Sequence, residues 1–368
     1  MIIKSFECEN FRNIKRAKID FSEGVNLLIG DNAQGKTNVA EGINIFSLGK
    51  SFRSQDDKEL VKFGEDGFYI SISYIDNEGE GKLEYSFYKK ERRRKKNGIK
   101  IDRISDMLGN FRSVLFFPDN MSIVKGGPEE RRSFLNSAIS QCYPEYVRNY
   151  HYYKNALENR NCLLKLSSKG MPIDTNEIMA WSDRLSEYAA YIYMSRKEYI
   201  ERLSAFAKKI MKEISDSSEE LELVFKSDIE GECDSHGSAY GEYKRIFTSQ
   251  VEHEMLTGTS LFGPHRDNIE IYINGKSARA YASQGQKRSI VLALKLAEGE
   301  VIKELFGEYP VYILDDVLSE LDEKRKKYLL EGIREKQIII TSCEDERENI
   351  RADNIIKVSR GEYVSTHR

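Results

Sequence analysis

A glycine-rich loop that contains a lysine and a threonine carries the clearest chemistry in the sequence. The residues Gly30-Asp31-Asn32-Ala33-Gln34-Gly35-Lys36-Thr37 match the pattern G-x-x-x-x-G-K-[ST]. In such a loop the backbone N–H groups point at phosphates, and glycine lets the chain approach them closely. Lys36 would reach the β- and γ-phosphates, and Thr37 would be a ligand of Mg²⁺. The pattern therefore predicts a nucleotide-binding site.

The segments on either side of this loop predict the elements that position it. The apolar run from Val25 to Ile29 predicts a buried strand, and the alternately apolar segment from Val39 to Phe46 predicts a helix. A strand before the loop and a helix after it is the context in which the pattern means phosphate binding. This context favours a phosphate loop over a glycine-rich turn.

Two aspartates supply the groups that hydrolysis would need. Asp315 and Asp316 follow the all-apolar segment from Val311 to Leu314, which predicts a buried strand. Ligands bind at the carboxyl edge of a parallel sheet, where the phosphate loop also lies. Asp315 would hold Mg²⁺ through its water shell, and Asp316 would accept the proton of the attacking water. The alternative is a pair of loop carboxylates that face solvent.

A second anion site is predicted at Ser283-Gln284-Gly285-Gln286, which opens a helix that runs to about Phe306. Its serine and its backbone N–H groups resemble a phosphate cradle, yet one γ-phosphate hardly needs two cradles on one chain. A two-fold dimer resolves this, because each serine loop would then face the nucleotide of the partner. The segment Ser319-Glu320-Leu321-Asp322 could line the same interface.

Length and composition set the class of protein. The chain has 368 residues, 32% of them charged, and a net charge of −3, so any nucleic-acid contact must come from a local patch. The five cysteines contain no C-x-x-C pair, which argues against a zinc site or a disulfide framework. We find no signal peptide, and no apolar run approaches the roughly 18 residues of a membrane span. We expect a cytoplasmic protein with no membrane partner.

An antiparallel layer and a basic run follow the phosphate loop. Strand periodicity is predicted over residues 2–7, 16–21, 69–75 and 82–88, and Asn97-Gly98 indicates a hairpin before residues 99–101. Residues 89–96 contain seven basic residues in eight. Two interpretations stay open, a solvated hairpin tip and a finger that touches nucleic-acid phosphates. The candidate DNA-binding residues are Arg92, Arg93, Arg94, Lys95 and Lys96.

A helical region comes next. Helix signals predict residues 129–142 and 144–168 as helices, and the apolar steps between about Asn176 and Ser215 predict one long helix with a narrow seam. Forty residues at a rise of 1.5 Å span roughly 60 Å, so we expect a helical arm that projects from the first domain. The tyrosines of this region are interpreted as packing residues.

Strand periodicity returns at residues 221–225 and 268–273, the second followed by an Asn274-Gly275 hairpin signal. We therefore expect the sheet to resume after the helical insertion. The predicted fold is α/β, a P-loop ATPase head with a mixed sheet, an antiparallel β layer and an inserted helical lobe or short arm. The predicted segments are residues 1–118 (head), 119–218 (lobe) and 219–368 (head).

Together these motifs resemble the ABC-type ATPase heads of the structural-maintenance-of-chromosomes (SMC) superfamily and, within it, the RecF family of recombination mediators. The resemblance covers nearly the whole chain. It depends on the phosphate loop, the serine motif with Lys287-Arg288, and four further segments, which are residues 9–13, residues 117–132, Gly263-Pro264-His265-Arg266-Asp267 and residues 314–322. Gly263 to Asp267 can also be interpreted as a structured turn.

The resemblance implies a weak DNA-dependent ATPase whose ATP-bound homodimer holds double-stranded DNA near single-strand gaps, at the nucleoid. RecR and RecO are its implied partners in loading recombinase onto gapped DNA. It implies a nucleotide site that includes Arg12, Asn13, Gly30, Asn32, Ala33, Gln34, Gly35, Lys36, Thr37, Asn38, Ser283, Gln286 and Asp322. The catalytic group would be Lys36, Asp315, Asp316 and Ser283, with Mg²⁺ at Thr37 and Asp315.

Two departures from the broader ABC pattern stand out. Asp316 takes the place of the usual catalytic glutamate, which fits slow hydrolysis, and Thr341 stands where many transporter heads carry a histidine.

Two other functions stay open. One is the nucleotide-binding subunit of a membrane transporter, against which the long helix, the basic run and Arg12-Asn13 argue. The other is a scaffold that binds nucleotide without significant turnover.

Overall fold

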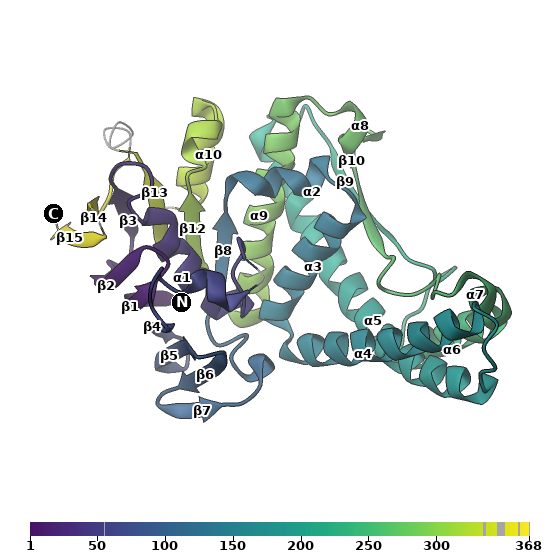
Figure 1. The fold of residues 1–368 in the computed structure, drawn as a ribbon. Coiled ribbons are helices and arrows are strands. Elements are labelled where there is room, and N and C mark those ends of the chain that lie inside the picture. The colour runs from purple at the N-terminus through teal and green to yellow at the C-terminus, as the bar shows by residue number, and fades with distance from the viewer. Residues whose placement is uncertain (55, 334–335, 344–349, 360, 368) are drawn as a thin grey trace. The chain divides into compact units, whose positions relative to one another are not determined.

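The computed structural model describes residues 1–54, 56–333, 336–343, 350–359 and 361–367. The chain forms two compact units. The head unit comprises Met1–Met121, Lys209–Ser218 and Gln284–Arg368, and the lobe unit comprises Ser122–Lys208 and Glu219–Ser283. Their elements are labelled in Figure 1.

A six-stranded, mostly parallel sheet organises the head unit. Its strands are β3 (Val25–Ile29), β8 (Ser113–Phe116), β12 (Val311–Asp315), β13 (Ile338–Ser342), β14 (Asn354–Ser359) and β15 (Glu362–His367), in the order β15-β14-β3-β13-β12-β8. All neighbours are parallel except β14 and β15. The carboxyl ends of β3, β12 and β13 therefore meet at one edge, where the phosphate loop and the predicted aspartates lie.

A second, antiparallel sheet of the head unit has the order β2-β1-β4-β5-β6-β7. Its strands are β1 (Ile2–Phe11), β2 (Ile14–Asp20), β4 (Gly67–Asp76), β5 (Gly79–Tyr88), β6 (Glu91–Lys96) and β7 (Ile99–Ile101). One apolar core joins both sheets to helix α1 (Lys36–Leu48) and contains Phe6, Ile43 and Ile313. The helix packs so closely that a β-carbon at Gly42 would lie 2.6 Å from the Phe6 ring. The predicted mixed sheet with an antiparallel layer is confirmed.

Two further helices of the head unit are α9 (Gln284–Phe306) and α10 (Glu323–Gly332). Helix α9 packs directly on the parallel sheet, because a β-carbon at Gly299 would lie 1.8 Å from the Tyr312 hydroxyl oxygen on β12. Short 3-10 helices are η1 (Asp57–Leu60), η2 (Ile104–Asp106), η3 (Pro118–Met121) and η4 (Leu318–Glu320). Helix α9 begins immediately after Ser283, as the sequence predicts.

The lobe unit combines helices with a three-stranded sheet, of which Figure 1 labels β9 and β10. Its helices are α2 (Ser122–Lys125), α3 (Pro128–Cys142), α4 (Pro144–Ser167), α6 (His236–Ser249), α7 (Val251–Thr257), α8 (Ala278–Tyr281) and most of α5 (Thr175–Ile214). The sheet has the order β11-β10-β9, with β9 (Leu221–Lys226), β10 (Asn268–Ile273) and β11 (Lys276–Ser277). The predicted helices at 129–142, 144–168 and 176–215 are confirmed within one or two residues.

The expectation that helix α5 is too long for a core to cover is wrong. Other helices of the lobe unit cover its apolar seam, so Ile178, Leu185 and Tyr199 are fully buried. Tyr188 contacts Tyr152 of α4, and Tyr193 contacts Tyr243 of α6. The seam is real, but apolar periodicity cannot say whether a helix partner covers it.

The expectation that the head sheet resumes after the helices is also wrong. Strand β9 pairs with β10, and β10 pairs with β11, as a separate sheet of the lobe unit. Residues 219–283 consequently group with the lobe unit, whereas the predicted segment 219–368 placed them in the head. The two Asn-Gly signals are confirmed as hairpin turns, with positive φ at Asn97 and Asn274. That the three predicted segments are separate domains stays a prediction.

The basic run forms strand β6 after a turn at Lys89-Lys90, so most of it lies in a hairpin strand and not at the tip, and the choice between a solvated hairpin and a DNA contact stays open. The strand pairs with β5 on one side and β7 on the other. Arg92 forms an ion pair with Asp57, and Arg94 lies over the Tyr85 ring at 4.9 Å. Arg93 and Lys95, which lie on the opposite face of the strand from Arg94, are exposed, and Arg92 is exposed as well.

Candidate nucleotide site

The loop between β3 and α1 has the tight geometry of a phosphate loop. Gly35 and Ala33 have positive φ values of 113° and 63°. A β-carbon at Gly30 would lie 2.1 Å from the Val358 carbonyl oxygen, and one at Gly35 would lie 2.7 Å from the Tyr363 hydroxyl. Only glycine fits these two positions without displacing β14 or Tyr363.

Lys36 is held at this loop by neutral acceptors. It is 9% exposed, and its ammonium group donates to the carbonyl oxygens of Gly30 at 2.6 Å and Asp31 at 2.8 Å. A carbonyl oxygen is a weaker partner for an ammonium group than an anion is. A bound phosphate would therefore compete well for the same protons.

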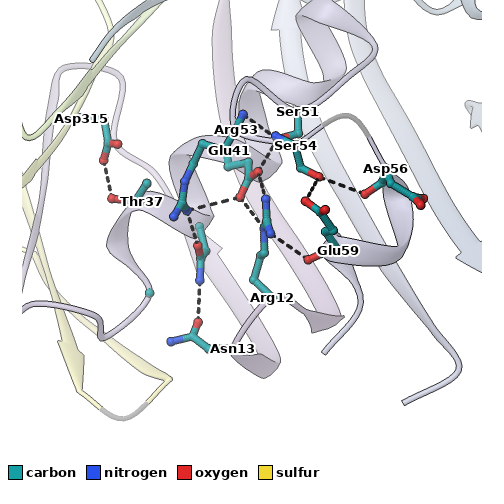
Figure 2. A network of polar contacts seen from close by, with 12 residues as sticks. Arg12, Asn13, Thr37, Glu41, Ser51, Arg53, Ser54, Asp56, Glu59 and Asp315 are labelled. Carbon is teal, nitrogen blue, oxygen red and sulfur yellow. Dashed lines mark hydrogen bonds and ion pairs between the residues drawn. The ribbon is translucent and has the colours of Figure 1, made fainter. Parts of the chain in front are cut away.

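Asp315 joins this loop to the carboxyl edge of the sheet. Thr37 on α1 and Thr341 on β13 both donate to its Oδ1 atom, at 2.9 and 2.7 Å, and Figure 2 shows the Thr37 contact. The backbone N–H of Asp316 donates to the Thr341 hydroxyl at 3.1 Å. Burial raises the pKa of Asp315, and the hydrogen bonds from the two threonines oppose this rise. The structure thus brings together Thr37, Asp315 and the Asp316 backbone.

A threonine hydroxyl beside a carboxylate fits Mg²⁺, which prefers oxygen ligands and takes few from the protein when phosphates and water complete its shell. Among the described residues, no group of three or more His, Cys, Asp or Glu side chains could hold a metal without such help. Asp316 is exposed, with a left-handed φ of 55°. Its carboxylate therefore stands outside the buried hydrogen bonds of Asp315.

A buried glutamate, which the sequence reasoning missed, organises the opposite flank of α1. Glu41 is fully buried and accepts from Arg12 Nε at 2.9 Å and Nη2 at 2.6 Å (Figure 2). Ser51 also donates to it, and Arg53 lies 3.7 Å away. A charged residue within the apolar pattern of α1, four positions after Thr37, was the signal for this network.

Asn13 and Asn38 brace the phosphate loop from the side. Asn13 donates to the Ala33 carbonyl oxygen at 3.0 Å and accepts from Asn38 at 2.7 Å. Arg53 donates to Asn38 at 3.1 Å. The predicted residues Arg12, Asn13 and Asn38 thus surround the loop, and their contact with nucleotide stays a prediction.

The remaining predicted residues lie at the start of helices or on the loop. Ser283 is exposed and directly precedes α9, and Gln286 lies half-buried in the first turn of α9. Asp322 caps α10, where it accepts from the Arg325 backbone N–H at 3.0 Å. The exposed Asn32 accepts from the Cys343 thiol at 3.3 Å, and Gln34 is half-buried.

The motif at Gly263–Asp267 lies in the lobe unit, where Asp267 is buried, His265 is half-buried and Arg266 is exposed. Asp267 pairs with Arg196 of α5 at 2.6 Å, with both side chains essentially buried. The Tyr153 hydroxyl lies 2.6 Å from His265 Nδ1. These contacts support the interpretation of this motif as a structured turn.

A parallel sheet that carries a phosphate loop, an aspartate at the end of β12 and a serine motif before α9 defines an ABC-type ATPase head of the SMC superfamily. The family model for the RecF/RecN/SMC N terminal domain matches residues 2–366. The chain belongs to the RecF family of DNA replication and repair proteins. Family and fold class, as the sequence predicts them, are confirmed.

Similar proteins support this assignment over the full length. The chain is 38% identical over 365 residues to the DNA replication and repair protein RecF of Thermoanaerobacter sp. (strain X514), covering 99% of each protein. It is 39% identical to the RecF protein of Exiguobacterium sp. (strain ATCC BAA-1283 / AT1b), covering 98% of each. A solved structure of the recombination mediator protein RecF with ATP, in the RecFOR pathway, matches with a TM-score of 0.92 and 36% identity, covering 99% of this chain and 97% of that one. Among the described residues, no helix is long and apolar enough to cross a membrane.

Proposed function

We propose that this chain is an ATP-dependent DNA-binding protein of DNA replication and recombinational gap repair, whose ATP-bound dimer holds DNA and whose slow hydrolysis releases it. The observation that carries the ATPase activity is the hydrogen bond between Thr37 and Asp315, which joins the phosphate loop to the carboxyl edge of the sheet. This pair would hold Mg²⁺, which neutralises charge on the phosphates when bound.

The chain's own groups have separate tasks in this proposal. Lys36 would bind the β- and γ-phosphates in place of its present carbonyl acceptors. Asp316, exposed beside the buried Asp315, would accept the proton of the attacking water. Its side chain is one methylene shorter than glutamate, which supports a weak ATPase.

The dimer is supported by the exposed start of α9. Ser283 and the first N–H groups of that helix form an anion site, which in a two-fold dimer would bind the γ-phosphate held by the partner. Gln286 and Asp322 would line the same interface. Two ATP molecules would then be enclosed in one dimer.

The DNA contact is proposed at strand β6, with Arg93 and Lys95 as the outward residues and Arg92, Arg94 and Lys96 as their supports. Double-stranded DNA and its junctions with single strands are the proposed ligands. RecR and RecO are the proposed partners, and the cytoplasm, at the nucleoid, is the proposed location.

The test is fluorescence anisotropy of labelled duplex and gapped duplex with ATP, with ADP and without nucleotide. We expect tight binding with ATP only, and slower release with Asp316→Asn because the dimer cannot reset. Equal DNA affinity in all three states would contradict the proposed gating. An unchanged release rate for Asp316→Asn would favour a nucleotide-binding scaffold.

The DNA surface is tested by the salt dependence of binding. Replacing Arg93 and Lys95 with serine should flatten the slope of log affinity against log salt by about 0.9 for each lost phosphate contact. Replacing the exposed Lys15 and Arg16 of β2 with serine is the control. A slope equal to that of the wild type in the Arg93 and Lys95 variant would remove β6 from the DNA contact.

A further inference from the structure

The first turn of α10 carries a charge that the helix itself does not favour. The residues after Asp322 are Glu323, Lys324, Arg325 and Lys326, so three cations lie at the positive end of a helix dipole. Cations are normally unfavourable there. A cation at this position needs contacts outside its own helix to offset that cost.

Arg325 has such contacts. Its Nε atom donates to Ser289 Oγ at 2.8 Å, and Ser289 is a buried residue of α9. Its Nη1 atom forms an ion pair with Asp322. Its Nη2 atom lies 3.3 Å from the place that a β-carbon at Gly285 would occupy. One guanidinium thus contacts the first two turns of α9 and the residue that caps α10.

The charge balance at this place is positive. The hydrogen bond from the Arg325 backbone N–H is the main cause that lowers the pKa of Asp322, and the charges of Arg325 and Arg288 lower it further. The N-terminal end of the α9 dipole adds partial positive charge. Arg325 therefore holds the start of α9 in place, and a bound anion would offset the positive charge there.

We propose that Arg325 is a positioning residue for the serine motif, and that it acts on the nucleotide held by the partner subunit and not on its own. The planar guanidinium of Arg325 connects the first turns of α9 to Asp322. This connection sets the position of Ser283 and of the N–H groups of Gly285 and Gln286. The inference rests on the proposed ATP-bound dimer.

The experiment mixes two inactive variants. Lys36→Ala removes nucleotide binding from one copy, and Arg325→Met removes the guanidinium from the other. In a mixed pair, one composite site keeps an intact Lys36 and an intact partner Arg325. The mixture should recover about a quarter of the wild-type turnover, since half of random pairs are mixed and one of their two sites is complete.

Controls separate the failure of this inference from that of the dimer. A mixture of Lys36→Ala with Ser283→Arg should recover the same turnover, and no recovery there would overturn the dimer and the inference with it. Recovery with Ser283→Arg but none with Arg325→Met would show that Arg325 acts on its own nucleotide, which overturns the inference alone.

Binding measurements complete the test. Arg325→Met alone should bind a fluorescent ATP analogue within about twofold of the wild type, yet lose turnover at least tenfold. Ser289→Ala keeps the guanidinium and removes its hydroxyl partner, so its turnover should also fall. This variant tests the same contact if Arg325→Met folds poorly. Arg325→Lys should not rescue turnover, because an ammonium group cannot span Ser289 and Asp322. Full activity of Ser289→Ala and Arg325→Lys would contradict the proposal.

Discussion

Two buried ion pairs of the lobe unit differ from the buried charges at the phosphate loop of the head unit in the partners that satisfy them. In the lobe unit Arg160 meets Glu254 and Arg196 meets Asp267, both at 2.6 Å. In the head unit Lys36 bonds to backbone carbonyls and Asp315 bonds to threonine hydroxyls.

We propose that this difference separates charges that stabilise the fold from charges that are kept for a ligand. A buried ion pair compensates its own desolvation, whereas a charge with neutral partners keeps an affinity for an opposite charge that arrives later. By this criterion Asp267 and His265 stabilise the fold and do not bind a ligand, although they lie in a segment that resembles the family. The predictions below test that division, from the largest effect to the smallest.

Lys36→Arg should cause the largest functional loss. The bulkier guanidinium does not fit the buried position of the ammonium group, so we expect ATP turnover to fall by about 10³-fold or more and ATP-dependent dimerisation to disappear. Thermal unfolding should change little. The control is Lys58→Arg on the exposed part of η1, and light scattering that shows an unchanged ATP-dependent dimer for Lys36→Arg would contradict the ligand role.

Asp267→Ala should cause the largest loss of stability. It leaves the Arg196 guanidinium buried without its carboxylate, which we expect to lower the free energy of unfolding of the lobe unit by about 3–5 kcal/mol. Urea unfolding followed by tyrosine fluorescence measures this. Asp183→Ala is the matched control on α5, because its pair with Lys244 is half exposed and worth at most about 1 kcal/mol. Equal effects of the two variants would contradict the division.

His265 should make stability depend on pH. Burial is the main cause that lowers its pKa to about 4 from the ordinary 6.5. Above pH 6.5 the neutral ring is fully stabilising, and this contribution, ~3 kcal/mol, is lost as the pH falls from 6.5 to 4 because the unfolded chain binds the proton first. In His265→Gln the slope of unfolding free energy between these pH values should shrink. The exposed His253→Gln should leave that slope intact.

Thr341→Val should have the smallest effect of the four. It removes the hydroxyl that donates to Asp315 and accepts from the Asp316 N–H, and groups that orient a metal ligand are worth about 10–100-fold in metal affinity or activity. We expect a higher Mg²⁺ requirement with unchanged stability. Thr341→Ser should restore the wild-type Mg²⁺ dependence, and an unchanged Mg²⁺ titration for valine would remove Thr341 from the site.

The elements that hold the site could be predicted because their signals are local. The apolar run of β3 and the serine before α9 mark their own boundaries, and both agree with the structure. The covering of α5 and the separate sheet of β9 and β10 could not be predicted, since a periodic pattern does not encode which element pairs with it. Strand β6 was hidden because its residues are nearly all basic and show no apolar alternation, and the contact of Arg92 with Asp57 joins residues distant in sequence.

Light scattering with bound nucleotide counted in the same sample tests the central claim most directly. Asp316→Asn with ATP should have about twice the monomer mass of 42.5 kDa and hold two ATP molecules. The double variant with Ser283→Arg should stay at the monomer mass with one ATP bound. A dimer that persists with Ser283→Arg, or a wild-type monomer that hydrolyses ATP at the full rate, would contradict the claim that each nucleotide is shared by two copies.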